Sequence, residues 1–175
     1  ICKMNSNFNP LSAEELVSRI NKIPRIRLAQ LPTALEYAPN ISKELNINLY
    51  IKRDDCTALA FGGNKTRHLE FIMAKTLSGE YDCILTGAAS QSNFCRQAVA
   101  AANKLNLDSY LVLMNGVKGK LMQGNFLLYN ILGANVDVVD GENLEDIPKH
   151  LDKKYDELIK EGRKPLLIYG GFGKE

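Results

Sequence analysis

Residues 61–97 read FGGNKTRHLEFIMAKTLSGEYDCILTGAASQSNFCRQ. A glycine pair precedes a helical pattern over 64–77, which carries apolar residues on one face and is closed by a glycine. A short apolar strand pattern follows at 83–85 and ends at 86–87, and the polar turn 90–93 begins a second helix. Helix, strand and helix joined by short connections indicate an α/β fold with parallel strands.

The same alternation continues to the end of the chain. It predicts, in order, a strand at 110–114, a helix at 119–132, a strand at 136–139, a helix at 144–161 and a strand at 165–169. Glycine turns follow the strands at 115–116, 140–141 and 170–171. We therefore predict a parallel sheet with helices on both faces and right-handed connections. Ligands of such sheets lie beyond the carboxyl ends of the strands, so the loops at 62–67 and 90–93 should share one edge.

The region before this unit has a different pattern. Ser12-Ala13-Glu14-Glu15 is a capping box that opens a short helix over 12–22. An extended crossing segment is expected at 25–39, and then a short helix near 40–45 with Asn40 as its cap. Apolar and polar residues alternate over 47–53, which predicts a strand.

Composition excludes several classes of protein. The 175 residues are 45% hydrophobic and 24% charged, with a net charge of +2. This is ordinary globular composition, and it favours neither nucleic acid nor a membrane surface as partner. No apolar run approaches the ~20 residues of a membrane span.

The cysteines and histidines give no metal-binding pattern. Neither His68 nor His150 has a cysteine or a second histidine at ligand spacing, so we predict no metal site. The four cysteines form no C-x-x-C pair, and the chain is too rich in core residues to be a disulfide scaffold. We expect a reduced, cytoplasmic setting, with Cys83 packed as a small apolar residue.

Lys65 has two interpretations. Asn64 can cap the helix that Lys65 opens, which places a primary amine at a helix N-terminus beside a flexible glycine pair. Such an amine can form a Schiff base with a carbonyl compound. An ordinary solvated lysine is the alternative. A phosphate-binding P-loop is excluded, because Asn64 stands where that motif requires glycine.

The turn Ser90-Gln91-Ser92-Asn93 also has two interpretations. Free N–H groups at a helix N-terminus favour an anion such as a substrate carboxylate. Alternatively, Ser90 or Ser92 merely caps the helix. Arg96, one turn later, is either a surface charge or a support for such an anion. Asp54 and Asp55 are read as the turn that ends the preceding strand rather than as a catalytic carboxylate pair.

Two motifs at a defined separation resemble a known family. Residues 62–70, GGNKTRHLE, and 91–97, QSNFCRQ, are similar to those of the 1-aminocyclopropane-1-carboxylate deaminase and D-cysteine desulfhydrase family. These are pyridoxal phosphate enzymes of the tryptophan synthase β-like fold, fold-type II. The stretches IKRDD at 51–55 and LGA at 132–134 match in order, and the resemblance covers roughly residues 22–171.

The resemblance implies a role for each matched residue. Lys65 would hold pyridoxal 5'-phosphate as a Schiff base, and Asn93 would hydrogen-bond the ring hydroxyl of the cofactor. Ser92 would grip the substrate carboxylate or assist proton transfer, with Asn64, Gln91 and Asn93 also at the substrate. Phe94 departs from the family pattern, which has a polar residue at this position.

The resemblance also implies that only the N-terminal half of the family is represented. The phosphate cup, the group that faces the pyridine nitrogen and the active-site tyrosines come from the later half. Residues 1–60 would belong to the large lobe, and residues 61–175 would form the small α/β lobe with the cofactor lysine and the substrate loop. We expect a fragment or one part of a split enzyme, whose partner is a complementing C-terminal half or a second copy in a dimer.

Three functions are therefore weighed. The first is a lyase or deaminase that converts a small amino acid to a 2-keto acid and ammonia, with D-cysteine desulfhydrase-like β-elimination placed ahead of 1-aminocyclopropane-1-carboxylate deamination. The second is a catalytically silent truncated domain that serves as a binding or regulatory module. The third is an unrelated doubly wound ligand-binding domain.

Overall fold

A parallel sheet forms the body of the protein. The computed structural model describes residues 10–115, 121–140 and 144–169. The sheet has four parallel strands in the order β5-β4-β3-β6. Its strands are β3 (Cys83–Ala89), β4 (Asp108–Met114), β5 (Asn135–Val139) and β6 (Pro165–Ile168). The predicted parallel sheet is thus confirmed.

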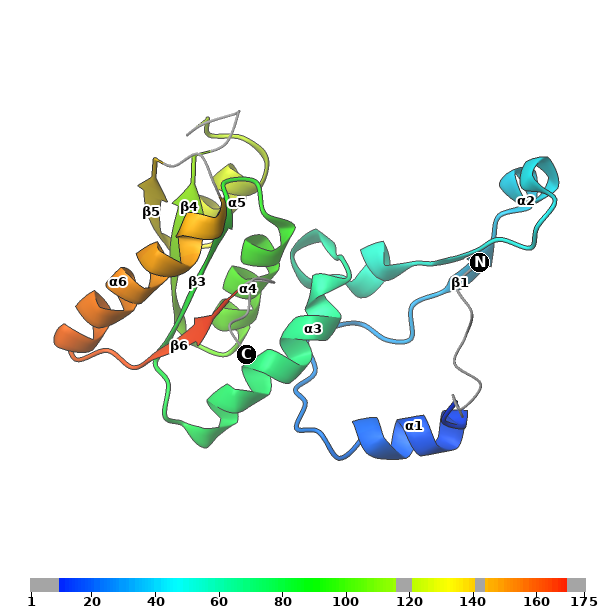
Figure 1. Cartoon of the computed structure of the whole chain (residues 1–175), viewed down its shortest axis with the longest axis horizontal. Coiled ribbons are helices and arrows are strands. Elements are labelled where there is room, and N and C mark those ends of the chain that lie inside the picture. The colour runs from blue at the N-terminus through cyan, green and yellow to red at the C-terminus, as the bar shows by residue number, and fades with distance from the viewer. Residues whose placement is uncertain (1–9, 116–120, 141–143, 170–175) are drawn as a thin grey trace.

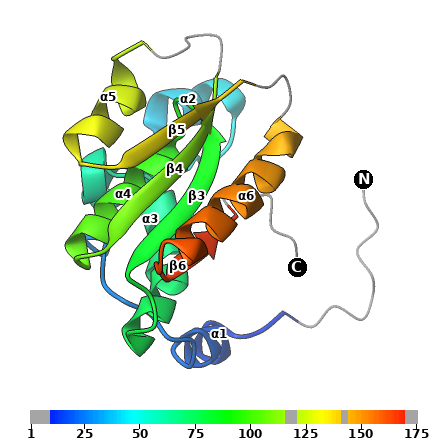
Figure 2. The same ribbon diagram turned by 90° about the vertical axis from the view of Figure 1, so that its left-hand side faces the viewer.

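Helices cover both faces of this sheet, as expected (Figure 2). The helices of the body are α3 (Lys65–Ile72), α4 (Asn93–Lys104), α5 (Gly124–Ile131) and α6 (Ile147–Lys160). One core cluster joins α3, α4 and α5 to one face, and a second joins α6 to the other face. Three alanines of α4 that pack on the sheet are fully buried: Ala98, Ala101 and Ala102. Small side chains there let the helix lie close to the strands.

Strand β3 is longer than predicted. Thr86 and Gly87, expected to end the strand, lie in its middle, where they pair with Leu111 and Val112 of β4. The Thr86 hydroxyl also donates to Ile168 O at 2.7 Å. Pairing on both sides of β3 satisfies the backbone there, so the ladder overrides the local turn signal.

Helix boundaries agree with the patterns to within a few residues. The helix expected at 64–77 is α3, continued by the 3₁₀ segment Met73–Ser78 and closed by Gly79 in a left-handed conformation. The glycine turns expected at 115–116, 140–141 and 170–171, and the start of the helix expected at 119–132, lie wholly or partly outside the described residues. No helix of the described ranges is long and apolar enough to cross a membrane.

The N-terminal elements extend away from the body (Figure 1). They are α1 (Ala13–Ile20), β1 (Leu35–Tyr37), α2 (Pro39–Leu45) and β2 (Tyr50–Lys52). Ser12 caps α1 as predicted, since its side chain accepts from Glu15 N at 3.1 Å. Asn40 does not cap α2, because the helix already begins at Pro39, whose fixed φ suits the first helical position.

Residues 35–52, which we call the N-terminal arm, form an exposed ribbon. Strand β2 is shorter than the predicted 47–53, and it pairs antiparallel with β1, which lies within the segment predicted only as extended. Apolar side chains on both strands remain open to solvent, with Leu35 63% and Ile51 45% exposed. A two-stranded ribbon is marginally stable without further packing.

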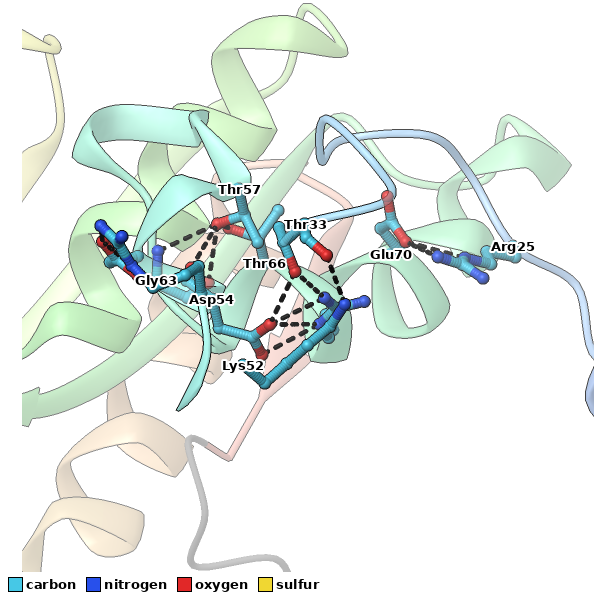
Figure 3. A network of polar contacts seen from close by, with 11 residues as sticks. Arg25, Thr33, Lys52, Asp54, Thr57, Gly63, Thr66 and Glu70 are labelled. Carbon is cyan, nitrogen blue, oxygen red and sulfur yellow. Dashed lines mark hydrogen bonds and ion pairs between the residues drawn. The ribbon is translucent and has the colours of Figure 1, made fainter. Parts of the chain in front are cut away.

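A buried carboxylate fastens α3 to the crossing segment (Figure 3). Glu70 is 0% exposed and forms an ion pair with Arg25. Its other oxygen accepts from Leu28 N and Ala29 N, both at 2.9 Å. Burial raises the pKa of Glu70, but these N–H groups and Arg25 outweigh burial, so that the net pKa lies below its usual 4.5.

The depressed pKa predicts how Glu70 supports stability. Because the folded-state pKa is lowered, the contribution of Glu70 is present above pH 4.5 and is lost as the pH falls through the lower folded value. Glu70→Gln should lower the free energy of unfolding of the complete gene product by about 2–3 kcal/mol near neutral pH. The deficit should shrink in acid.

Denaturant titrations at neutral and acid pH measure this difference. Glu15→Gln is the matched control, because Glu15 forms an exposed ion pair with Arg19 one turn along α1. That change should cost less than about 0.5 kcal/mol at either pH. A deficit for Glu70→Gln that stays constant with pH contradicts the account.

Candidate active site

Lys65 is the first residue of α3, and its side chain is exposed. The described residues give its amine no hydrogen-bond or ion-pair partner. Asn64 occupies the N-cap position, but its side chain makes no capping hydrogen bond, so that expectation is wrong. The physical reason is that Asn64 already has helical dihedrals, φ −61° and ψ −22°, whereas a capping residue is normally extended.

The loop before Lys65 has strained backbone. Positive φ angles occur at Ala58 (71°), Ala60 (44°), Phe61 (67°), Gly62 (72°) and Gly63 (133°). Each positive φ at a residue with a Cβ costs on the order of 1–2 kcal/mol. Such conformations persist only where surrounding contacts impose them, and they concentrate at ligand sites.

Helix α4 supplies the contacts that hold this loop. The carbonyl oxygen of Gly62 accepts from Arg96 Nη2 at 2.9 Å and from Gln97 Nε2 at 3.0 Å. The other end of the Gln97 amide accepts from Thr66 Oγ1 at 2.7 Å, which fixes its orientation. The lysine loop and the start of α4 therefore lie side by side, as predicted. The reason differs from the prediction, because the strand before the lysine loop, β2, pairs only with β1 among the described strands and is not part of the parallel sheet.

Of the two interpretations of Arg96, a free surface charge is contradicted by this contact, and support of a bound anion stays a prediction. Its guanidinium donates to Gly62 O, and it forms no ion pair within the described part of the chain. Burial lowers the pKa of Arg96. Arg96 supports the lysine loop rather than standing free at the surface.

A second set of contacts ties the loop to the end of β2 (Figure 3). Gly63 N donates to Asp54 O at 3.0 Å and to Thr57 Oγ1 at 2.9 Å. The Asp54 carboxylate binds Arg67 through bonds of 2.7–3.0 Å, and Arg67 holds the pKa of Asp54 below its usual range. Asp55 pairs instead with Arg53. The two aspartates are thus separate turn residues, as read from the sequence.

Ser92 is the N-cap of α4. Its backbone is extended, and its Oγ accepts from Cys95 N at 3.3 Å. The capping interpretation is therefore correct. In this cap the Ser92 oxygen only accepts, so the hydroxyl proton remains available to donate to a ligand. The carbonyl of Ser92 accepts from Tyr129 Oη at 2.8 Å, which joins the turn to α5.

The two amides beside Ser92 face α5. Gln91 Oε1 accepts from Asn125 N at 2.9 Å, and Gln91 Nε2 donates to Gln123 O at 3.2 Å. Both ends of the Gln91 amide are thus engaged within the protein. Asn93 is exposed, and its Oδ1 accepts from Asn125 Nδ2 at 2.9 Å. Sequence patterns did not identify Asn125, because it lies on a different helix, about thirty residues away.

Phe94 points into the core rather than toward the open site. It is 7% exposed and belongs to the cluster beneath α3, α4 and α5. Its ring lies 6.2 Å from that of His68. Within the described ranges, no three His, Cys, Asp or Glu side chains converge in a way that could hold a metal ion.

The loop geometry predicts unequal costs for two glycine substitutions. Gly62 and Gly79 have nearly the same φ, +72° and +74°, but Gly62 has ψ −179°, a region open essentially only to glycine, whereas Gly79 is left-handed helical with ψ 8°. A Cβ at Gly62 would lie 1.8 Å from Asp55 O, whereas a Cβ at Gly79 would meet nothing within 4 Å. Gly79→Ala should cost about 1–2 kcal/mol in free energy of unfolding through its φ alone, and Gly62→Ala clearly more. Equal losses in denaturant titrations would refute both reasons for the larger cost at Gly62, its backbone conformation and its close contact with Asp55 O.

Similar proteins of known name are found among archaea and bacteria. A Pyrococcus horikoshii protein named "Putative 1-aminocyclopropane-1-carboxylate deaminase" is 39% identical over 90% of this chain and 47% of its own length. A Klebsiella pneumoniae D-cysteine desulfhydrase is 37% identical over 87% of this chain and 47% of its own length. The crystal structure of an ACC deaminase homologue superposes with a TM-score of 0.83 and 38% identity, covering 89% of this chain and 47% of that one.

The chain therefore spans about half the length of the curated relatives it matches. The parallel sheet and its helices are the corresponding part of a fold-type II enzyme. The sequence pattern of the family described as pyridoxal-phosphate dependent enzyme matches residues 26–173, most of the chain. On this evidence, the chain belongs to the pyridoxal-phosphate dependent enzyme family.

Proposed function

We propose that the complete gene product is a lyase or deaminase that uses pyridoxal 5'-phosphate to convert a small amino acid to a 2-keto acid and ammonia. D-cysteine desulfhydrase-like β-elimination is placed ahead of 1-aminocyclopropane-1-carboxylate deamination. The observation that carries the proposal is the exposed amine of Lys65, at the end of a strained loop that is bonded to the first turns of α4.

The groups at this edge fit the cofactor. A pyridoxal aldehyde needs a primary amine, and Lys65 offers one without an internal partner among the described residues. The ring oxygen needs a donor, and the exposed amide of Asn93 can provide it. When bound, the cofactor withdraws electrons from the α-carbon of the substrate. Lys65 would hold the cofactor and then carry a proton at its Nζ.

The turn at Ser92 is proposed to bind the substrate. The first N–H groups of α4 and the Ser92 hydroxyl can donate to a substrate carboxylate, and the helix dipole favours the negative charge. Asn64, exposed next to Lys65, is a further proposed substrate contact. For Gln91 we assign support of the turn instead of substrate contact, because both ends of its amide already bond the segment at the start of α5.

Residues 1–60 are proposed to belong to a large lobe, and residues 61–175 to form the small lobe. The exposed apolar side chains of the N-terminal arm need a covering surface. The family relatives are about twice as long, so the proposed cover is the C-terminal half of the same enzyme, as one polypeptide or as a complementing chain. A homodimer is the other proposed assembly. Free Cys56, Cys83 and Cys95 support a reducing, cytoplasmic setting.

Removing the amine tests the assignment of Lys65. The complete gene product should show visible cofactor absorbance, which borohydride removes while fixing the cofactor to the Lys65 peptide. Lys65→Ala should abolish this absorbance and the labelled peptide, as measured by spectroscopy and mass spectrometry. Lys75→Ala is the control, because Lys75 is an exposed lysine at the other end of the same helical segment.

Absorbance that survives unchanged in Lys65→Ala would disprove the role of Lys65. A complete gene product that binds no cofactor at all would favour the silent binding module instead.

Isolating residues 1–175 tests the need for a second half. The piece alone should self-associate through the exposed arm and should release no keto acid, because its apolar ribbon and its site lack their cover. Sedimentation and a keto-acid assay measure both properties, and addition of the remaining half should restore activity. A piece that is monomeric, unfolds cooperatively and is fully active would overturn the proposal.

A further inference from the structure

Asn125, near the start of α5, binds Gln91 in the turn before α4 and Asn93, the first residue of α4. Its Nδ2 donates to Gln91 O at 2.7 Å and to Asn93 Oδ1 at 2.9 Å. Its backbone N–H donates to Gln91 Oε1 at 2.9 Å, and Gln91 Nε2 donates to Gln123 O at 3.2 Å. Four hydrogen bonds therefore connect the start of α5 to the turn.

Main-chain groups determine the orientation of every amide in this network. Gln91 O can only accept, so the end of the Asn125 side chain that faces it must be the NH₂ group. That NH₂ group has two protons, and the second is directed to Asn93. The atom of Asn93 that receives it must therefore be Oδ1. The NH₂ group of Asn93 is left as the end of the amide that is free to meet a ligand.

The position of Asn125 is itself fixed by packing. Phe126 and Tyr129 of α5 are buried in the core beneath α4. Tyr129 Oη donates to Ser92 O at 2.8 Å, one residue from Asn93. These contacts restrict movement of α5 relative to the turn. The backbone N–H of Asn125 also donates to Gln91 Oε1, which fixes the backbone that carries the Asn125 side chain.

We propose that Asn125 is a positioning residue that fixes the Asn93 amide so that it presents only its NH₂ group to the ring oxygen of the cofactor. This inference rests on the proposed function, in which Asn93 meets that oxygen. An NH₂ group stabilises a negatively charged ring oxygen, whereas Oδ1 would repel it. Without Asn125, nothing in the described structure would prevent the Asn93 amide from presenting the wrong end.

The variant Asn125→Asp tests this role. A carboxylate can donate neither to Asn93 Oδ1 nor to Gln91 O. The Asn93 amide should therefore turn its NH₂ group toward the new acceptor and away from the cofactor. In the complete gene product, the dissociation constant for pyridoxal phosphate should rise about tenfold, the size of one lost bond to a charged oxygen. The pH midpoint of the cofactor's visible absorbance should move up by about one unit.

Asn130→Asp is the matched control. Asn130 lies on the same helix, and its Nδ2 donates to Phe126 O, away from the turn. This change introduces the same charge and also removes the bonds of Asn130 Nδ2 to Phe126 O and to Met122 Sδ. It should leave the pH midpoint of absorbance and the dissociation constant unchanged. Thermal unfolding of both variants checks that the fold is retained.

A double-mutant cycle separates positioning from a general effect of charge. Asn93→Ala alone should raise the pH midpoint, and adding Asn125→Asp to it should raise the midpoint no further. If Asn125→Asp shifts the midpoint equally with and without Asn93, or shifts it no more than Asn130→Asp does, the inference is overturned. If Lys65→Ala leaves the absorbance unchanged, the proposed function fails instead, so the two failures are distinguishable.

Discussion

The carbonyl oxygen of Gly62 is the acceptor on which the arrangement of the site depends. Two side chains of α4, those of Arg96 and Gln97, bind this single atom. The loop around it has several positive φ angles, each of which would relax if the loop were free. Hydrogen bonds to a buried carbonyl offset that strain, because leaving such an acceptor unpaired costs about 1–3 kcal/mol. Lys65, three residues later, is thereby held in a fixed relation to the helix that begins at Asn93.

The order of the strands explains why these helices meet. Helices α4 and α5 follow the adjacent strands β3 and β4 and lie on the same face of the sheet, where they pack against each other. Right-handed crossovers place successive helices in this way. Helix α6 lies on the opposite face with its own core cluster. The site is therefore built at the N-terminal ends of α3, α4 and α5, whose side chains share one core.

Periodicity in the sequence predicted the sheet and its helices, because these depend on local patterns. The lysine loop does lie beside the Ser92 turn as predicted, but it follows β2, which is outside the parallel sheet, and side chains of α4 hold it there. Predictions failed where tertiary contacts override local signals. The turn signal at Thr86 is overridden by pairing of β3 on both sides, and Asn64 has helical dihedrals that its capping preference does not reveal. The link from Asn125 to Asn93 joins two helices, and no local pattern encodes it.

Several contacts connect the site to the N-terminal region, and they act on α3 or the loop before it. Glu70 binds the crossing segment, and Asp54 O, just beyond β2, accepts from Gly63 N. Gly63 is two residues from Lys65, so this bond fixes the backbone close to the residue that carries the amine. The bonds from α4 to Gly62 hold the same loop from the other side. The backbone at Lys65 is thus held from two sides, by α4 and by the turn beyond β2.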